Sequence, residues 1–519
     1  MKYRLGIDVG GTNTDAVILD ETNRVIAKYK ETTTPDVSTG ITKAVEKVLE
    51  LSNIEPAKIT NAMLGTTHAT NAIVERRGLS KVGLIRLSAP SGFGIPPFVD
   101  WPEDMVETTG NLFIIVKGGY EYNGVPISNP DKEEIKRALY QLQEGGIESL
   151  AVSGAFSPVN DAQENLVKEL AIEIFGKDFP ITLSNEIGSI GLIERENAAV
   201  LNAAIRKLAE KAYGGFQDVL KKHGINADLF ITQNDGTLMS IEYAKKYPVL
   251  TIASGPTNSL RGAAFLSGIR EAIVVDVGGT TTDVGILTKG FPRESSSAVE
   301  IGGVRTNFRM PDLVSLGLGG GSIVTEHDGK ITVGPKSVGY RLVEEALIFG
   351  GQTVTATDIA VAAGTAKIGD PSKASSLHAE QVEKATERIK TMIEEAIDKV
   401  KVSAKELPVV VVGGGSILVP ENLRGASEVI KPQHFEVANA IGASIAQVSG
   451  SIDGVYDITA KGREAVIEEV KNEAKREAIR AGADATTVEV VELEEIPLAY
   501  LPSNAVRFKV KAVGSLKSL

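Results

Sequence analysis

Cysteine is absent from this chain of 519 residues, and histidine occurs only five times. The lack of cysteine excludes disulfides, thiolate nucleophiles and cysteine-ligated iron–sulfur or zinc sites. Any metal ion must therefore bind to oxygen or histidine ligands.

Long apolar runs are absent as well, since no stretch approaches the ~20 residues that cross a membrane. The sequence MKYRLGID enters a strand pattern directly, without the charged and apolar segments of a signal peptide. Positive charge is in deficit, because 55 Lys and Arg face 67 Asp and Glu, for a net charge of −12. We therefore expect a cytoplasmic protein with no membrane partner and no nucleic-acid partner.

An internal repeat organises the chain, whose length predicts about three domains at roughly 150 residues each. Residues 8–20 (DVGGTNTDAVILD) and 276–288 (DVGGTTTDVGILT) are identical at nine of thirteen positions. Each copy joins two apolar runs through a Gly-Gly turn, which is the pattern of a β-hairpin. Two lobes with related hairpins would explain the repeat.

The turn of each copy has the composition of a phosphate-binding loop. Paired glycines let N–H groups approach phosphate oxygens, and threonine hydroxyls add donors. The residues are Gly10, Gly11, Thr12 and Thr14 in the first copy, and Gly278, Gly279, Thr280 and Thr282 in the second. A single copy is more often a plain hairpin, but two copies in one register favour a nucleotide site. No lysine follows either turn, so neither is a Walker A loop.

Four aspartates accompany the turns. Asp8 and Asp276 end the preceding strands, where they can hold a Mg²⁺ ion that bridges phosphates. Asp15 and Asp283 close the loops and are candidates for outer Mg²⁺ ligands or for a general base. Their alternative role is to bond the backbone of their own loop, as in an Asx turn.

A third glycine cluster follows the apolar run 409–412, which is typical of a central parallel strand. Its members, Gly413, Gly414, Gly415 and Ser416, would offer a backbone platform for a purine, although an ordinary strand-to-helix turn is the alternative. Two runs of small residues, 197–204 and 439–446, favour close helix crossing at a hinge between lobes. Further helices are expected at 39–51, 131–144, 380–401 and 463–481, and a buried strand at 150–152.

In this order the pieces resemble the two phosphate loops, the adenosine loop and the two connecting helices of the actin, hexokinase and heat-shock chaperone ATPase superfamily. The resemblance implies an α/β, two-lobed actin-like ATPase (ribonuclease H-like) fold with a central interlobe nucleotide cleft. A narrower resemblance is to the hydantoinase/oxoprolinase A family. It rests on LGTTHATNAIVERRG (64–78), IERENAAVLNAAI (193–205), ITQNDGTL (231–238), ASGPTNSLRGA (253–263), DVGGTTTDVGIL (276–287) and GLGGGSIV (317–324), which occur in the family's order.

This second resemblance implies an ATP-dependent hydrolase that activates the carbonyl of a cyclic amide or imide (hydantoin, 5-oxoproline or lactam type) by phosphorylation. It implies ATP and Mg²⁺ as cofactors, with Asp8 and Asp276 at the metal. A B-type partner protein would complete ring opening. The substrate side implied by the resemblance comprises Thr66, Thr67, Asn71, Arg195 and Glu196.

Three parts are expected from these assignments. The first, 1–190, carries the first phosphate loop and a subdomain rich in Pro and Gly inserted around 88–130. The second, 191–450, carries the second phosphate loop and the adenosine loop, and 451–519 forms a small α/β extension. The family's block after VGP is reduced here to VGPKSVGYR (333–341), and a short tail replaces the family's large C-terminal domain, so the substrate class stays open.

Other functions fit the same fold. A small-molecule kinase would release a stable phosphorylated product, and a nucleotide-gated ATPase or a carboxylase subunit would act with a partner. The activator ATPases of radical dehydratases need a cysteine-bound cluster, so the absence of cysteine excludes them.

Overall fold

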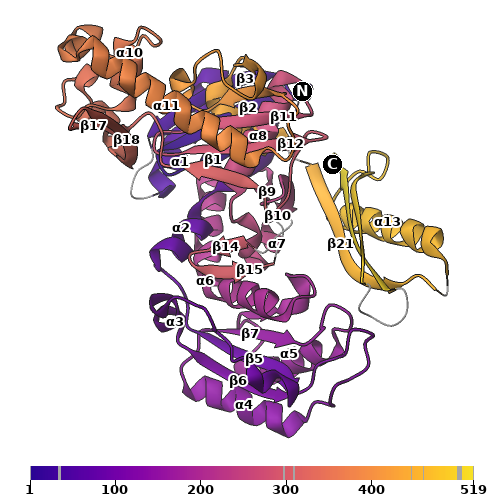
Figure 1. Cartoon of the computed structure of the whole chain (residues 1–519). Helices are drawn as coiled ribbons and strands as arrows, with labels where there is room; N and C mark the ends of the chain where they lie inside the picture. The colour runs from indigo at the N-terminus through magenta and orange to yellow at the C-terminus, as the bar shows by residue number, and fades with distance from the viewer. Residues whose placement is uncertain are drawn as a thin grey trace.

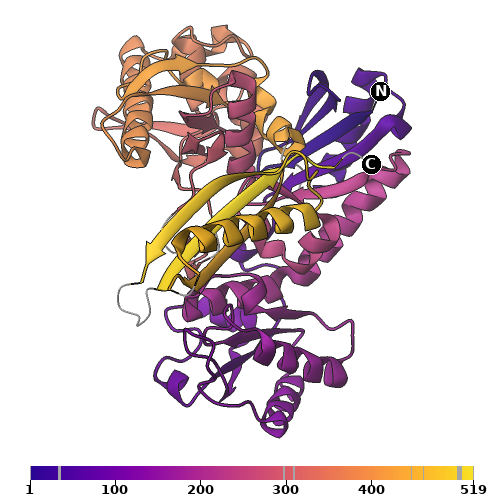
Figure 2. The ribbon, with the colours of Figure 1, turned by 90° about the vertical axis from the view of Figure 1, so that its right-hand side faces the viewer.

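The chain folds into two lobes, each built on its own β-sheet, with a third unit at one end (Figure 1). The computed structural model describes residues 2–32, 37–295, 299–307, 310–445, 447–459, 461–498 and 505–517. From the side, the two lobes lie next to each other and the third unit lies below them (Figure 2). The predicted α/β, two-lobed fold is confirmed.

The first lobe is built on a mixed nine-stranded sheet in the order β22-β23-β21-β10-β9-β4-β1-β2-β3. Its strands are β1 (Tyr3–Val9), β2 (Asn13–Asp20), β3 (Val25–Thr32), β4 (Ile59–Thr66), β9 (Asp228–Thr232), β10 (Thr237–Ser240), β21 (Gln447–Asp457), β22 (Glu489–Pro497) and β23 (Ala505–Gly514). Strands β1 and β2 form the first predicted hairpin. Helix α1 (Val37–Ser52) and the C-terminal half of α6 (Leu192–Lys222) cover one face, where Val45 and Phe216 share a buried cluster with Leu5.

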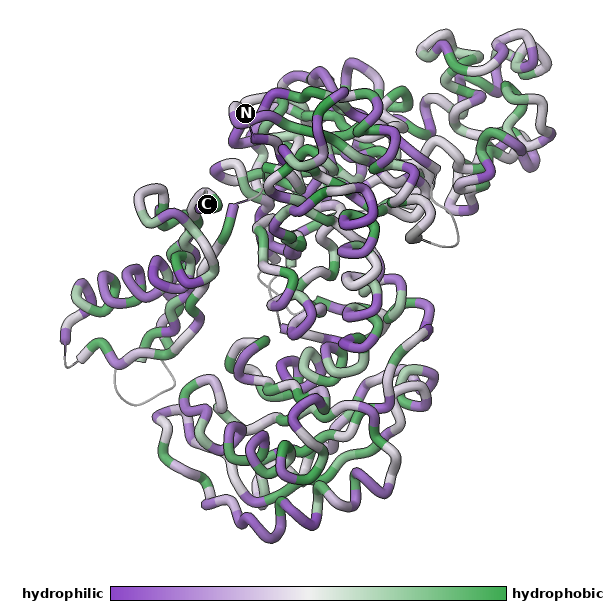
Figure 3. Tube along the Cα trace, turned by 180° about the vertical axis from the view of Figure 1, so that it is seen from behind, coloured by the Kyte–Doolittle hydropathy of each residue, from purple (hydrophilic) through white to green (hydrophobic). Residues whose placement is uncertain are grey.

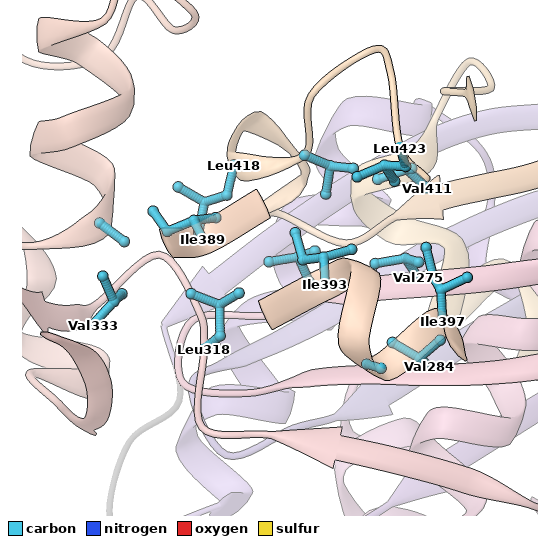
Figure 4. Close-up of a cluster of buried hydrophobic side chains, with 14 of the residues drawn as sticks. Val275, Val284, Leu318, Val333, Ile389, Ile393, Ile397, Val411, Leu418 and Leu423 are labelled. Carbon is cyan, nitrogen blue, oxygen red and sulfur yellow. The ribbon is translucent and has the colours of Figure 1, made fainter. Parts of the chain in front are cut away.

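The second lobe has a six-stranded sheet in the order β13-β12-β11-β19-β20, with β16 paired to β12. Its strands are β11 (Ala272–Val277), β12 (Thr282–Thr288), β13 (Phe291–Pro292), β16 (Leu313–Leu316), β19 (Leu407–Val412) and β20 (Ala426–Ile430). Helix α11 (Ala379–Val400) lays Ile389, Ile393 and Ile397 on one face, against Val275 and Val411 (Figure 4). The second predicted hairpin, β11–β12, therefore sits on a closed apolar core.

The third unit is a parallel four-stranded sheet in the order β6-β5-β7-β8. It contains β5 (Val82–Ala89), β6 (Leu112–Lys117), β7 (Ser149–Gly154) and β8 (Ile181–Leu183), with α3 (Glu103–Thr109), α4 (Lys132–Glu144) and α5 (Ala162–Phe175). Helices α4 and α5 pack on one face and the N-terminal half of α6 on the other. The subdomain expected at 88–130 is thus only part of a larger unit. Strand β6 (LFIIVK) lies inside that range, and it was not predicted from the sequence. Its residues do not alternate between apolar and polar, and turn-forming residues surround it.

Two helices lie between the two sheets: α8 (Ser254–Ser267) shares a cluster with the second sheet, and α12 (Ala438–Ile445) packs on the first. Glycine allows α12 to approach both neighbours. A Cβ on Gly442 would stand 1.8 Å from the carbonyl oxygen of Asn258, and one on Gly6 of β1 would stand 2.5 Å from that of Ala440. The close crossing expected of 439–446 is therefore present up to Ile445, since residue 446 lies outside the described residues.

The other run of small residues, 197–204, lies elsewhere. It is part of α6, where Ala198 and Leu201, together with Ile205, pack against the third unit. The helix that crosses α12 closely is α8.

The C-terminal strands join the first sheet through a short ladder in which Thr237 and Leu238 of β10 pair with Gln447 and Val448 of β21. Helix α13 (Arg463–Arg480) buries Val466 and Val470 against these strands, while hydrophilic residues predominate along its length (Figure 3). Strands β9 and β10, which the expected boundary at 190 places in the second lobe, hydrogen-bond in the first sheet.

The remaining elements complete the lobes. They are α2 (His68–Glu75), α7 (Ile241–Lys246), α9 (Leu342–Glu345), α10 (Ala356–Ala362), β14 (Val299–Ile301), β15 (Val304–Thr306), β17 (Ser322–His327) and β18 (Lys330–Ser337). The 3₁₀ helices are η1 (Pro56–Lys58), η2 (Ser91–Gly94), η3 (Ser184–Glu186), η4 (Pro248–Thr251), η5 (Gly339–Arg341), η6 (Leu347–Phe349), η7 (Pro371–Ser376), η8 (Ser416–Leu418) and η9 (Phe435–Val437). Across the described ranges, every helix is too short or too polar to cross a membrane.

Candidate nucleotide site

The two hairpins have the same internal geometry. Asp8 pairs across the strands with Asp15, and Asp276 pairs with Asp283 at the equivalent position. Each turn is closed by a glycine N–H, from Gly10 to the carbonyl of Asn13 and from Gly278 to that of Thr281, both at 2.9 Å. The sequence repeat is therefore a structural repeat.

The two turns meet between the lobes. A Cβ added to Gly279 would stand 2.9 Å from Cγ2 of Thr12 and 3.0 Å from its Oγ1. Gly11 is exposed, and a Cβ there would have no neighbour within 4 Å in the described parts of the chain. The two turns therefore lie side by side between the lobes, as a ligand held by both of them requires.

The predicted threonines divide into two pairs. Thr12 and Thr280 lie on the turns, half-exposed. Thr282 is buried and its hydroxyl donates to the carbonyl of Leu318 at 2.6 Å. Thr14 is buried too, and its hydroxyl has no hydrogen-bond partner among the described residues. The expectation that Thr282 donates to a ligand is therefore corrected, because its hydroxyl proton is used within the protein. Donation by Thr14 stays a prediction.

The third glycine cluster lies against the second hairpin. Gly415 N–H donates to the carbonyl of Val277 at 2.7 Å, and a Cβ on Gly413 would stand 2.3 Å from Oδ1 of Asp276. Ser416 is buried beneath the loop. A Cβ on Gly414 would meet nothing within 4 Å across the described residues. The structure thus places this predicted platform next to a predicted metal ligand.

A further glycine loop, Gly319 to Gly321, supports the same hairpin, and no role was predicted for it. Gly320 and Gly321 N–H groups donate to the carbonyls of Gly278 and Gly279, at 3.0 and 2.7 Å. A Cβ on Gly319 would stand 2.5 Å from the nitrogen of Thr280. Glycine here is a packing requirement of the turn.

Asp8 is the most constrained carboxylate of the site. Its Oδ1 accepts from Nδ2 of Asn258 at 3.0 Å, and its Oδ2 accepts from Nδ2 of Asn439 at 3.0 Å. Burial raises the pKa of Asp8 to about 7; the neighbouring carboxylates of Asp15 and Asp276 also raise it, against the lowering effect of the two amides. Further negative charge is therefore unfavourable here without an added cation.

The other aspartates share this environment. Asn439 also donates to Oδ2 of Asp15 at 2.8 Å, and Lys30 of β3 forms an ion pair with Oδ1 of Asp15 at 2.5 Å. Burial raises the pKa of Asp276, although the Ser259 hydroxyl and the Lys30 charge lower it. Burial raises the pKa of Asp283 to about 6, against a hydrogen bond from Ser315. The carboxylates of Asp15 and Asp283 thus interact with side chains of neighbouring strands or helices. The Asx-turn alternative had considered only bonds to the backbone of their own loops.

The donor set fits a Mg²⁺ ion that arrives with a nucleotide. Among the residues that the structure describes, no three His, Asp or Glu are grouped so that they could hold a metal ion by themselves. Mg²⁺ commonly keeps several waters and takes one or two carboxylates plus phosphate oxygens. Asp8 and Asp276, one from each hairpin, are oxygen donors of that kind.

The predicted substrate residues fall into two groups. Thr66 ends β4 and Thr67 follows it, directly beside the first hairpin. Both the N–H and Oγ1 of Thr67 donate to the carbonyl of Val9 at 3.3 Å. Asn71 Nδ2 donates to Oγ1 of Thr67 at 3.4 Å. This group therefore borders the nucleotide site.

Arg195 and Glu196 do not belong to that group. Arg195 is fully buried and donates to the carbonyls of Ser189 and Ile190 at 2.9 and 2.7 Å. Glu196 is 1% exposed and accepts from Nε of Arg86 at 2.7 Å in a buried ion pair. Their polar atoms bond to protein groups, so we correct their assignment from substrate binding to structure.

Sequence reasoning missed Lys30, Asn258 and Asn439 as parts of this site. Asn258 lies in ASGPTNSLRGA and Asn439 in a predicted hinge helix, but neither motif indicates a side chain that reaches an aspartate. Lys30 aligns with Asp15 only once the β2–β3 register is known.

Comparison with known families matches residues 4–175 to the hydantoinase/oxoprolinase N-terminal region and residues 195–372 to hydantoinase/oxoprolinase. The acetophenone carboxylase gamma subunit of Aromatoleum aromaticum is 29% identical over 394 residues, which cover 69% of this chain and 53% of that protein. The caprolactamase subunit alpha of Pseudomonas jessenii is 27% identical over 383 residues, covering 70% and 54%. The chain therefore spans about half the length of these curated relatives.

Two solved structures share the fold. The ATP-dependent caprolactamase from Pseudomonas jessenii has a TM-score of 0.77 at 19% identity, covering 99% of this chain and 88% of that chain. The nucleotide-free acetone carboxylase structure has a TM-score of 0.70 at 19% identity, with the same coverage of 99% and 88%.

Proposed function

Because the chain belongs to the hydantoinase/oxoprolinase family, we propose that it uses ATP to activate the carbonyl of a cyclic amide or imide, of hydantoin, 5-oxoproline or lactam type. The observation that carries the proposal is that two equivalent Gly-Gly hairpins meet at Thr12 and Gly279 between the lobes. Each hairpin contributes one buried or half-buried aspartate, Asp8 or Asp276, beside its turn.

The proposed chemistry converts a poor leaving oxygen into a good one. The carbonyl oxygen attacks the γ-phosphorus of ATP, the bond to the β-phosphate oxygen breaks, ADP leaves and the ring N–H loses its proton. Water then adds to the carbon, the nitrogen regains a proton and departs, and an acyl phosphate remains. A second water attacks the carbonyl carbon of the acyl phosphate and the bond from that carbon to the bridging oxygen breaks. The products are a carboxylate and a phosphate that keeps the original carbonyl oxygen. The sum is two waters and one ATP per opened ring.

Different groups of residues would bind the phosphates, the metal ion and the substrate. N–H groups of the two turns, with the hydroxyls of Thr12 and Thr280, would bind phosphate oxygens. Asp8 and Asp276 would hold Mg²⁺, which when bound neutralises charge on the phosphates. Thr66 and Thr67 lie beside the first hairpin and would border the substrate.

We propose a B-type partner protein as well, supplying groups for the steps after phosphorylation. The support is that two relatives are named as subunits, of acetophenone carboxylase and of caprolactamase. A carboxylase role is a second candidate, favoured by the 29% identity to the first of these. There a ketone or bicarbonate oxygen would take the phosphate. A kinase of the same fold would instead release the phosphorylated compound.

Oxygen-18 separates these possibilities. The purified chain, alone and with co-purifying protein, is incubated with ATP, Mg²⁺ and hydantoins, 5-oxoproline or lactams labelled at the carbonyl. ADP, phosphate and ring-opened product are measured separately, and ketones with bicarbonate form a parallel set. We expect ¹⁸O in the released phosphate only when ring opening occurs, and ring opening only with partner. Unlabelled phosphate would contradict carbonyl phosphorylation, and ring opening by the chain alone would contradict the partner.

A further inference from the structure

Asn258 and Ser259 are neighbours on α8, yet they act on aspartates of different lobes. Nδ2 of Asn258 donates to Oδ1 of Asp8 at 3.0 Å, and the hydroxyl of Ser259 lowers the pKa of Asp276 against the effect of burial. Both side chains are buried, at 1% and 3% exposure. Of the two, Asn258 makes a direct hydrogen bond to an aspartate of the predicted phosphate loops.

The Asn258 bond crosses from one lobe to the other. Helix α8 belongs to the second lobe, because Leu260 and Ala263 share a buried cluster with Val274 of that sheet. Asp8 belongs to the first sheet, so the Asn258 bond joins the two lobes.

The room for this bond is built into the first sheet. A Cβ on Gly65 of β4 would stand 2.2 Å from Oδ1 of Asp8 and 2.4 Å from Nδ2 of Asn258. The same Nδ2 donates to Oγ1 of Thr232 at 3.1 Å, which fixes the amide. Its Oδ1 is buried and has no hydrogen-bond partner in the described parts of the chain. A buried acceptor without a partner costs free energy. The Asn258 amide nevertheless leaves its oxygen unpaired and turns its NH₂ group toward the Asp8 carboxylate, which when ionised can only accept a hydrogen bond.

We propose that Asn258 is a positioning residue that acts through Asp8. It aligns the first phosphate loop with the second lobe, to whose sheet α8 belongs. This inference rests on the proposed nucleotide site.

The test compares Asn258→Ala with Ser267→Ala, a control at the end of the same helix. The Ser267 hydroxyl donates to the carbonyl of Ala263 at 2.7 Å and accepts from the N–H of Ile269 at 3.2 Å, so neither bond reaches an aspartate. Single-turnover ATP hydrolysis, the nucleotide Kd and hydrogen exchange of residues 8–14 are measured. Asn258→Ala is expected to slow the single turnover about 10- to 100-fold, the range for a lost hydrogen bond to a charged group. Its Kd should change less than about 3-fold. Exchange in residues 8–14 should become faster, and Ser267→Ala should match the native protein.

Asn258→Asp distinguishes positioning from packing, because it keeps the volume and replaces the donor with a carboxylate. We expect it to be at least as slow as Asn258→Ala. Recovery of the native rate in Asn258→Asp would overturn the inference, as would native turnover together with native exchange in Asn258→Ala. If the native protein binds no nucleotide, the proposed function fails, and exchange alone decides: faster exchange in Asn258→Ala supports positioning, and unchanged exchange overturns it.

Discussion

Gly262 of α8 lies against Ala438 of α12 with no space for a side chain between them: a Cβ on Gly262 would stand 1.9 Å from the Ala438 carbonyl oxygen. Backbone cannot yield as a flexible side chain does, so the helices must separate to admit a methyl group. The distance between α8 and α12 is therefore set by glycine.

Gly262→Ala is expected to lower the free energy of unfolding by about 1–3 kcal/mol, the usual cost of overpacking. Gly214→Ala in α6 is the matched control, because a Cβ there meets nothing within 4 Å in the described residues. The control should be neutral or more stable by about 0.5–1 kcal/mol. Urea unfolding measures both, and equal behaviour of the two variants would show that the crossing tolerates a side chain.

Asp276→Asn is expected to reduce Mg²⁺-dependent ATP turnover by ~10²-fold or more, because phosphoryl transfer depends on charge stabilisation by the metal. Asp398→Asn removes the same charge at an exposed position of α11, outside both hairpins, and should retain activity. Initial rates at saturating ATP are compared. Turnover at the native rate in Asp276→Asn would remove this residue from the proposed site.

Glu196→Gln is expected to act on stability, since it leaves the buried Arg86 guanidinium without its counter-charge. Breaking a buried pair from one side costs about 3–5 kcal/mol. Glu194→Gln, two residues earlier, loses only a partly exposed pair with Arg305 and should cost about 0–1 kcal/mol. Thermal unfolding is the measurement. A large change in substrate KM with unchanged stability in Glu196→Gln would restore the substrate role.

Asp235 gives a prediction for pH. Burial would raise its pKa, but the ammonium of Lys511, 3.0 Å from Oδ2, and hydrogen bonds from Thr237 outweigh burial and hold the pKa below its ordinary value of 3.8. The folded state therefore binds this proton more weakly than the unfolded chain does. The stabilisation is present above the unfolded pKa and is lost as pH falls through the folded pKa.

Asp235→Asn should accordingly lower the Tm at pH 7, and its difference from the native protein should shrink as pH falls below about 4. Melting curves from pH 7 to pH 3 measure this. Lys511→Met and the double variant close a cycle, in which Lys511→Met also loses the ion pair with Glu294 at 3.1 Å. The effects should be less than additive, because both single variants lose the ion pair between Asp235 and Lys511. A difference in Tm that is constant with pH would contradict the role of the charge.

The parts of this fold that were predicted correctly depend on short stretches of sequence. The hairpins at Asp8 and Asp276, the strand before Gly413 and helix α11 each have a pattern complete within about twenty residues. Apolar alternation, paired glycines and helical spacing are local properties, so they can be read without knowing the partners.

The errors involve contacts between distant residues. Asn439 reaches Asp8 across 431 positions, and Asn258 reaches it across 250. Glu196 has the composition of a substrate residue, and only its burial against Arg86 shows that it holds the third unit to α6. Small residues in 197–204 and in α8 satisfy the same criterion, and only the packing shows which of them meets α12.

The ion pair between Lys30 and Asp15 also distinguishes the two halves of an otherwise repeated frame. A linear ligand lying between two equivalent hairpins would meet the same groups whichever end entered first. Asp15 has an ammonium group beside it, whereas Asp283, at the corresponding place, has the hydroxyl of Ser315. The duplicated halves thus differ in charge. A chain of phosphates bound between them, as proposed above, would therefore have one preferred orientation.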